Sequence, residues 1–228
     1  MGKNDNGNNG RTELVFVVDR SGSMGGLESD TIGGFNSMLS KQRTIAGECR
    51  VTTLLFDHRI ETLHNHLDIR EVNDLTSRDY WVRGSTALLD AIGLAIDRMI
   101  VTQRHTAAAY RAQHVLFVII TDGYENASRR YSLHQIKQMI TYERERYHWE
   151  FVFLGANIDA EQTAGDFGIS PRCATDFHAD GQGIKASFEA VACAATAVRG
   201  GADLDDLSAP VFLGGVRDDY RSRRRMKR

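Results

Sequence analysis

The sequence predicts an α/β protein: a doubly wound, mostly parallel sheet with one antiparallel edge strand and helices on both faces. Short apolar runs alternate along the chain with longer stretches whose apolar residues recur at helical spacing, which is the pattern of β-α units. Residues 14–18 and 115–120 are continuous runs rich in β-branched side chains, as strands buried on both faces are. The runs at 51–56 and 60–63 are only three residues apart, which suits an antiparallel hairpin.

The remaining elements follow in chain order. Besides the four runs above, we expect a strand at 151–155 and a short extended piece at 174–177. Stripes of apolar residues predict helices over 30–46, 88–99, 133–147, 159–166 and 184–198. The hairpin interrupts the parallel order, so we place it at an edge of the sheet.

Length and composition indicate one domain with a sizeable core, since the chain has 228 residues, 42% of them hydrophobic and 25% charged. We expect a disordered Asn/Gly-rich tail at 1–10, the domain at 11–200, and a C-terminal extension at 201–228 that ends in an Arg-rich run. The formal net charge of -2 gives no overall attraction to nucleic acid or anionic lipid.

Two further features concern the compartment. No apolar run approaches the length of a membrane span, and the first ten residues contain no apolar stretch, so we expect a cytoplasmic protein without a membrane segment. The cysteines Cys49, Cys173 and Cys193 are widely spaced and form no C-x-x-C pair. This spacing favours buried, reduced thiols over a disulfide framework or a thiolate metal site.

The residues that carry chemistry follow the expected strands. The run at 14–18 leads directly into Asp19-Arg20-Ser21-Gly22-Ser23, one carboxylate and two hydroxyls in a D-x-S-x-S pattern. Ligands gather where the strands of open α/β sheets end, and two further oxygen donors fall there. Thr86 opens the helix at 88–99, and Asp122 follows the strand at 115–120. We therefore expect these donors to converge from three loops.

Such a donor set suits magnesium. Mg²⁺ prefers near-octahedral oxygen coordination, retains several waters and is held by few carboxylates. The hydroxyls of Ser21, Ser23 and Thr86 can bind the ion without neutralising its charge, while Asp19 and Asp122 bind it directly or through water and orient the hydroxyls. The ion then stays electron-poor, and the most favourable additional ligand is an anionic oxygen from another molecule.

With these residues the chain resembles the von Willebrand factor type A domain. The metal-ion-dependent adhesion site of that family consists of a D-x-S-x-S, a Thr in a Gly-rich loop and an Asp after a central strand. The resemblance covers about residues 11–200 and implies five metal ligands, namely Asp19, Ser21, Ser23, Thr86 and Asp122. Arg20 occupies a variable position and is not implicated.

The resemblance also implies a function. It suggests a non-catalytic interaction module in which Mg²⁺, or alternatively Mn²⁺, accepts a Glu or Asp carboxylate from a partner protein. Intracellular domains similar to this one often work beside ATP-driven remodelling machines or in stress-response and defence clusters, but fold and motif do not choose among these partners.

Other interpretations of the same residues remain open. The segment 21–26 is also compatible with a flexible turn, Thr86 with a helix N-cap, and Asp122-Gly123 with a turn pair. A phosphatase that forms an aspartyl-phosphate on Asp19 beside magnesium is chemically sensible, although Ser21 stands where related enzymes carry a second Asp. The sequence contains neither a P-loop nor a G-x-S-x-G nucleophile elbow.

Two clusters outside the motif have alternative interpretations as well. A hairpin carrying polar histidines is commoner than a zinc site, although the residue types would suit zinc at His58, His64, His66 and Asp68. Six of the last eight residues are basic, which suits either a disordered solubilising tail or binding of nucleic acid, acidic protein or phosphate.

Overall fold

A computed structural model describes residues 10–206 and 211–226 of the chain. Its centre is one six-stranded sheet in the order β3-β2-β1-β4-β5-β6. The strands are β1 (Thr12–Asp19), β2 (Cys49–Phe56), β3 (Ile60–Asp68), β4 (His114–Thr121), β5 (Glu150–Gly155) and β6 (Ala174–Asp176). All neighbouring strands pair in parallel except β2 and β3, which are antiparallel. The predicted sheet, with its antiparallel edge hairpin, is confirmed.

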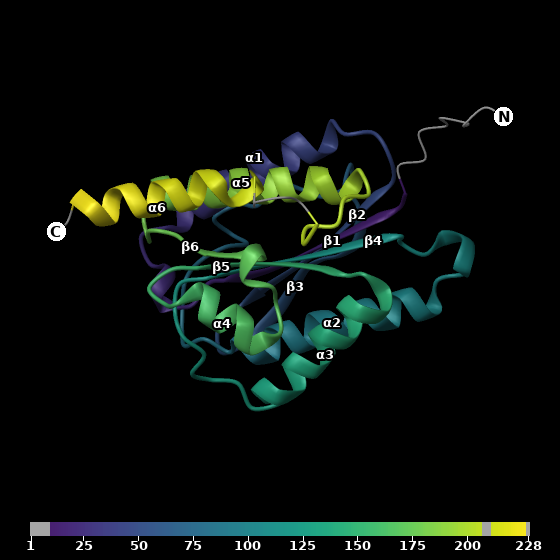
Figure 1. Cartoon of the computed structure of the whole chain (residues 1–228), viewed down its shortest axis with the longest axis horizontal. Coiled ribbons are helices and arrows are strands. Elements are labelled where there is room, and N and C mark those ends of the chain that lie inside the picture. Colours follow the sequence, from purple (N-terminus) through teal and green to yellow (C-terminus); the bar gives the residue numbers. More distant parts are fainter. Residues whose placement is uncertain (1–9, 207–210, 227–228) are drawn as a thin grey trace.

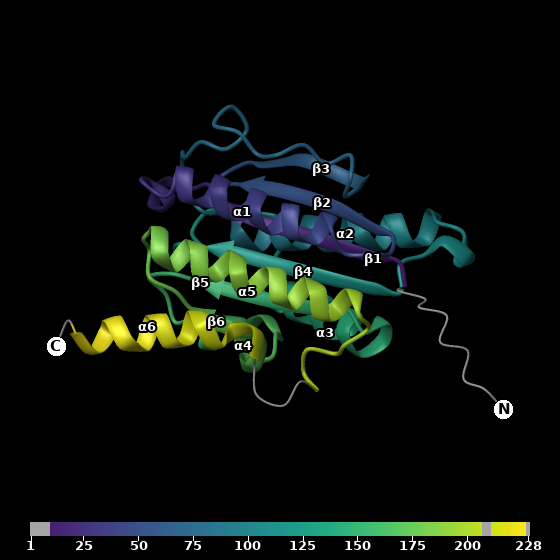
Figure 2. The same cartoon turned by 90° about the horizontal axis from the view of Figure 1, so that it is seen from above.

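Helices cover both faces of the sheet (Figure 1). The longer ones are α1 (Glu28–Arg43), α2 (Leu88–His105), α3 (Leu133–Tyr147), α4 (Ala160–Phe167), α5 (Gly181–Arg199) and α6 (Gly214–Met226). Helices α1, α5 and α6 lie side by side on one face (Figure 2), and α2, α3 and α4 lie on the other. Short 3₁₀ turns occur at Gly22–Met24, Ala108–Tyr110, Pro171–Cys173 and Val211–Leu213.

The core lies between these layers, with β1 and β4 at its centre. Residues 14–18 of β1 and 115–120 of β4 are at most 2% exposed, which explains why both strands read as continuous apolar runs. On the α1 side, the Phe35 ring contacts Phe16 edge to face at 5.3 Å and Phe188 at 6.2 Å between centroids.

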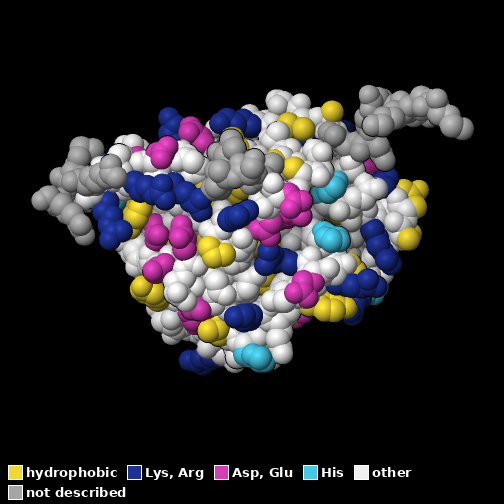
Figure 3. All heavy atoms as spheres, in the orientation of Figure 1, with side chains coloured by type: hydrophobic (Ala, Val, Ile, Leu, Met, Phe, Trp, Pro, Cys, Tyr) yellow, Lys and Arg dark blue, Asp and Glu magenta, His cyan; other side chains and the backbone are white. Residues whose placement is uncertain are grey.

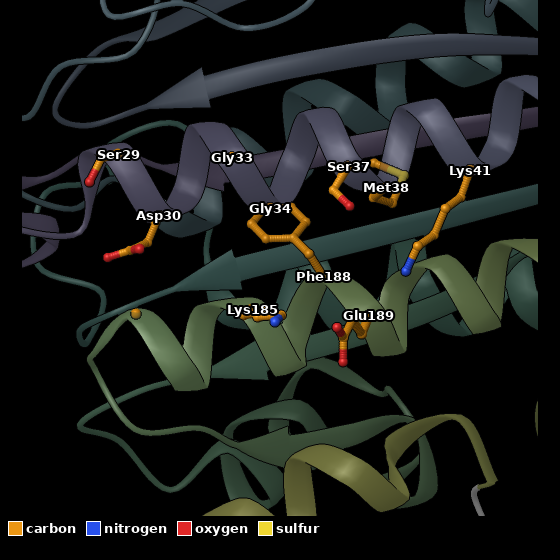
Figure 4. Close-up of a pocket in the computed structure, with 11 residues that line it drawn as sticks. Ser29, Asp30, Gly33, Gly34, Ser37, Met38, Lys41, Lys185, Phe188 and Glu189 are labelled. Carbon is orange, nitrogen blue, oxygen red and sulfur yellow. The ribbon is translucent and has the colours of Figure 1, made fainter.

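A glycine allows the close approach of α1 and α5. The ring of Phe188 on α5 lies against Gly34 of α1 (Figure 4), and a Cβ atom at Gly34 would be 2.3 Å from Phe188 Cδ2. No neighbouring atom lies within 4 Å of the Cβ position at Gly33, one residue earlier. Helix packing therefore requires glycine at position 34 but not at position 33.

Three details differ from the sequence-based expectations. Strand β3 extends to Asp68, because its polar residues on an exposed edge give no apolar signal. The C-terminal extension contains helix α6, where the sequence predicts no helix. Cys49 and Cys173 are buried and free, as expected, whereas Cys193 is free but exposed. Of the predicted tail at 1–10, residues 1–9 lie outside the described residues.

Candidate functional site

The order of the strands places the candidate site at the switch point of the sheet. From β1 the chain continues to β2 on one side and later returns to β4 on the other, and both strands pair with β1. Asp19 is the last residue of β1 and Asp122 follows the end of β4. Because parallel strands end at the same edge, the two carboxylates are delivered to one crevice, where ligands of such sheets bind.

Asp19 is fixed by hydrogen bonds on both carboxylate oxygens. Its Oδ1 accepts the backbone N–H of Ser21 at 2.6 Å, and its Oδ2 accepts the hydroxyl of Thr121 at 2.6 Å. The Tyr80 hydroxyl donates to the Asp19 carbonyl at 2.5 Å. Burial raises the pKa of Asp19, and the hydrogen bonds from Thr121 and Ser21 offset part of this increase. Asp19 is therefore a rigid, desolvated carboxyl group.

The three hydroxyl residues gather beside it. The side-chain oxygens of Ser21 and Ser23 are 3.1 Å apart. A Cβ atom at Gly123 would lie 3.4 Å from Ser23 Oγ and 3.9 Å from Thr86 Oγ1, so both hydroxyls face the residue that follows Asp122. The structure thus brings the hydroxyl-bearing loops to the end of β4.

Backbone contacts lock the Thr86 loop to its neighbours. Gly22 N–H donates to the carbonyl of Gly84 at 3.1 Å, joining this loop to the D-x-S-x-S segment. Thr86 N–H donates to Asn126 Oδ1 at 2.9 Å, and the Thr86 carbonyl accepts the N–H of Asn126 at 3.0 Å. The three loops therefore form one hydrogen-bonded unit.

Residues after β4 also cap helix α2. Glu125 Oε2 accepts the N–H of Leu89 at 2.9 Å, and Ser128 Oγ accepts that of Asp90 at 3.0 Å. These N–H groups belong to the first turn of α2, where a helix cannot satisfy them itself. The start of α2, and with it Thr86, is held by the segment that carries Asp122.

Asp122 is the most strongly perturbed carboxyl group of the site. Burial raises its pKa to about 6, the charge of Asp19 acts in the same direction, and a hydrogen bond from the side-chain amide of Asn157 opposes both. No Lys, Arg or His forms an ion pair with Asp19 or Asp122 among the residues that the structure describes. Within the described part of the chain, the two neighbouring carboxylates thus have no basic side chain as counterion.

Arg20 has a role that sequence reasoning missed. The residue is 0% exposed, its Nε donates to Asp57 Oδ2 at 3.1 Å, and its Nη2 donates to Glu61 Oε2 at 2.8 Å. Arg83 Nε donates to the same Asp57 oxygen at 2.7 Å, and its guanidinium lies 4.3 Å from the ring centroid of Trp81. Asp57 thereby joins the D-x-S-x-S loop to the loop before Thr86.

The sequence does contain a signal for the contact between Arg20 and Asp57. Asp57 directly follows β2, so it lies at the same edge of the sheet as Asp19, the last residue of β1. Three further residues also hold the site in place, namely Tyr80, Thr121 and Asn157. They lie in loops or at a strand end and belong to no sequence motif, so the sequence did not predict their role. Only the tertiary contacts identify them.

The histidine hairpin does not form a metal cluster. His64 Nδ1 hydrogen bonds to Thr53 Oγ1 at 3.0 Å, and His66 Nδ1 lies 2.7 Å from Glu13 Oε1. No group of three or more His, Cys, Asp or Glu residues with metal-binding geometry occurs within residues 10–206 and 211–226. The zinc alternative therefore has no support in the described structure.

No helix within residues 10–206 and 211–226 is long and apolar enough to span a bilayer.

Comparison with known proteins rests on structure, because neither a family model nor a curated protein sequence matches the chain. Proximal thread matrix protein 1 from the mussel byssus superimposes with a TM-score of 0.55 at 14% identity, over 82% of this chain and 46% of the mussel chain. This chain therefore spans less than half of that protein. Another structure of the mussel protein, described as having a zinc-occupied MIDAS motif, also gives a TM-score of 0.55.

For two other similar structures, the match extends over nearly their full length. The vWF domain of the type V pili tip protein Mfa5 from Porphyromonas gingivalis has a TM-score of 0.57 at 11% identity, over 82% of this chain and 95% of that one. The SpRpn10 VWA domain has a TM-score of 0.51 at 12% identity, over 79% and 94% respectively. Strand order, helical layers and these similarities agree: the chain has the fold of the von Willebrand factor type A domains.

Proposed function

We propose that the chain binds a divalent cation, Mg²⁺ in the first instance, through five side chains and uses it to capture an acidic residue of a partner protein. The proposed ligands are Asp19, Ser21, Ser23, Thr86 and Asp122. The observation that carries the proposal is the pair of neighbouring, desolvated carboxyl groups that form no ion pair with a described basic residue, with three hydroxyl groups on the loops beside them. A bound dication would neutralise both carboxylates and restore the solvation that burial removes.

The donor set fits such an ion by its chemistry. Hydroxyl and carboxylate oxygens are the ligands of hard cations, and only two of the five side chains carry charge. Asp19, held on both oxygens, is suited to keep the neighbouring serines in place. An ion bound there would offer a coordination position to a carboxylate oxygen of the partner. A zinc-occupied MIDAS in a structure of the same fold supports this proposal.

Two observations favour binding over phosphoryl transfer from Asp19. Asp19 is 0% exposed, so a phosphate ester, which is much larger than a bare cation, has no open approach to its carboxylate. No Lys or Arg that could stabilise a transferring phosphoryl group pairs with Asp19 in the described ranges. Turnover of a generic phosphate ester that is lost in Asp19→Asn would contradict the non-enzymatic proposal.

The contacts of the Arg-rich C-terminal helix favour a structural role over nucleic-acid binding. Arg223 pairs with Asp180 and Asp219, and Arg217 donates to the carbonyl of Ala174 at 2.9 Å. Figure 3 shows basic side chains over α6 with acidic ones beside them. Two of the arginines thus hold α6 against the domain.

The proposal also includes a cytoplasmic location. Free cysteines agree with a reducing compartment of this kind.

A thermal-shift and calorimetric titration with Mg²⁺ alone tests the proposal. At a concentration about 100 times its Kd, a ligand of the folded state stabilises by about 2.7 kcal/mol, which raises Tm by about 5–10 °C for a chain of this size. The nearly isosteric Thr86→Val removes one ligand and should abolish most of this shift. Ser85→Ala, which removes the neighbouring hydroxyl, should retain it.

The same titration with Mn²⁺ ranks the two ions. If Mg²⁺ and Mn²⁺ both leave the Tm of the wild-type protein unchanged and produce no binding heat, the proposed metal site is wrong. An equal shift in Thr86→Val and wild type would remove Thr86 from the ligand set.

A further inference from the structure

A basic hollow adjoins the candidate metal site. It has a volume of about 710 Å³ and is lined by residues from the β2–β3 turn, the Thr86 loop and the segment after β4. Four of its lining residues are His58, Arg59, Arg129 and Arg130, all of them exposed. Three guanidinium groups and an imidazole therefore border one open space, although the chain as a whole has a formal net charge of -2.

Asp90, the acidic residue of the lining, forms no ion pair with the basic side chains of the hollow among the described residues. Asp90 is only 8% exposed, and its carboxylate accepts the backbone N–H groups of Arg129 at 2.9 Å, Arg130 at 2.8 Å and Tyr131 at 2.9 Å. None of the guanidinium groups of Arg59, Arg129 and Arg130 forms an ion pair with a described residue. His58 Nδ1 lies 3.0 Å from Asp57 Oδ1, so it is the three guanidinium groups that are available to a ligand.

The hollow and the candidate metal site share a wall. Ser85 lines the hollow and immediately precedes Thr86. Asn126, also in the lining, binds the Thr86 backbone through the hydrogen bonds described above. At Gly84 the backbone comes so close to His58 that a Cβ atom would be 2.1 Å from its Nδ1. An extended peptide advances about 3.3 Å per residue, so a segment of a few residues bound at Thr86 is long enough to reach the hollow.

We propose that the basic hollow binds further acidic side chains of the same protein segment whose carboxylate binds the metal. The proposal rests on the proposed function and deepens it, because it assigns the partner a chemistry: a run of Asp or Glu residues in place of a single acidic residue. Exposed charges contribute modestly one at a time and depend on salt. Their combined effect selects acidic segments and accelerates encounter.

Fluorescence anisotropy with two labelled peptides of about ten residues tests this inference. One probe is a run of glutamates, and the other carries a single Glu among Ser and Gly. In Mg²⁺ at low salt, the wild-type protein should bind the Glu-rich probe about tenfold more tightly than the single-Glu probe, as two or three exposed charge contacts allow. Raising the salt concentration should shrink this ratio.

The Arg129→Glu/Arg130→Glu variant should reduce the ratio to about one while leaving the Mg²⁺ thermal shift intact. Lys137→Glu/Arg146→Glu is the matched control, since it makes the same charge change on exposed residues of α3 that form no ion pair with the described chain, and it should keep the ratio. Arg59→Glu provides an independent single change and should lower the ratio in part.

The outcomes separate the two proposals. Mg²⁺-dependent binding with equal affinity for both probes, or an equal loss in the α3 control, overturns the inference and leaves the metal site standing. Absence of Mg²⁺-dependent binding of either probe counts against both. An oligonucleotide that binds without Mg²⁺ and is lost in Arg129→Glu/Arg130→Glu would assign the hollow to nucleic acid and also overturn the inference.

Discussion

Replacing Asp57 by alanine tests how the site is held together. Asp57 is 0% exposed, and its carboxylate accepts the Nε–H groups of Arg83 at 2.7 Å and Arg20 at 3.1 Å and the backbone N–H of Arg59 at 2.8 Å. Burial by itself would raise the pKa of Asp57, but the hydrogen bonds and charges of these arginines outweigh it and lower the pKa. The charged form is therefore the one that stabilises the fold.

The magnitude follows from what the substitution leaves behind. Arg20 is 0% exposed, and its remaining acidic partner, Glu61, has a side chain that is 56% exposed. Without Asp57 a buried guanidinium keeps only one solvent-screened ion pair. Removing one partner of a buried pair costs about 3–5 kcal/mol, whereas an exposed pair is worth about 0–1 kcal/mol. We expect Asp57→Ala to lose about 3–5 kcal/mol of unfolding free energy.

Urea unfolding at neutral pH measures this loss, with Asp74→Ala as the control. Asp74 also pairs with an arginine, Arg43, at 2.9 Å, but its side chain is 58% exposed, so its removal should cost at most about 1 kcal/mol. Because the pKa of Asp57 is lowered, its contribution is present at neutral pH and is lost as pH falls through that lowered value. Equal unfolding free energies for the two variants would refute the reasoning.

Two further predictions concern the core and the charge balance. Gly34→Ala should lower the unfolding free energy by about 1–3 kcal/mol, because the new Cβ would overlap the Phe188 ring. Gly33→Ala has open space at its Cβ and should leave the unfolding free energy unchanged or raise it by up to about 1 kcal/mol. Thermal unfolding of the two variants compares them. Burial raises the pKa of Glu150 from 4.5 to about 7, with the charge of Asp203 acting in the same direction. The folded state then holds more protons than the unfolded chain, so stability should fall as pH rises between these values. Glu150→Gln should flatten this part of the profile, and a slope unchanged in the variant would contradict the assignment.

The order of elements could be predicted because each of them has a local signature. Residues 14–18 and 115–120 are buried on both sides and so are apolar throughout, and the helices on the two faces show one apolar stripe each. Strand β3 and helix α6 lacked such signatures. In β3 the polar residues His64 and His66 interrupt the pattern, and α6 is held by tertiary contacts of Arg217 and Arg223 with segments more than 40 residues away.

The sequence alone predicted the fold class, which the structure confirms, and it proposed the five oxygen donors, because periodicity and a motif at a strand end are local properties of the chain. Tertiary structure decided how those donors are held and what surrounds them. Arg20, assigned no role from the sequence, is a buried anchor only because Asp57 and Arg83 arrive from other loops. Likewise, the hollow beside Thr86 is basic because the Asp90 carboxylate binds backbone N–H groups, and the arginine side chains have no acidic partner among the described residues.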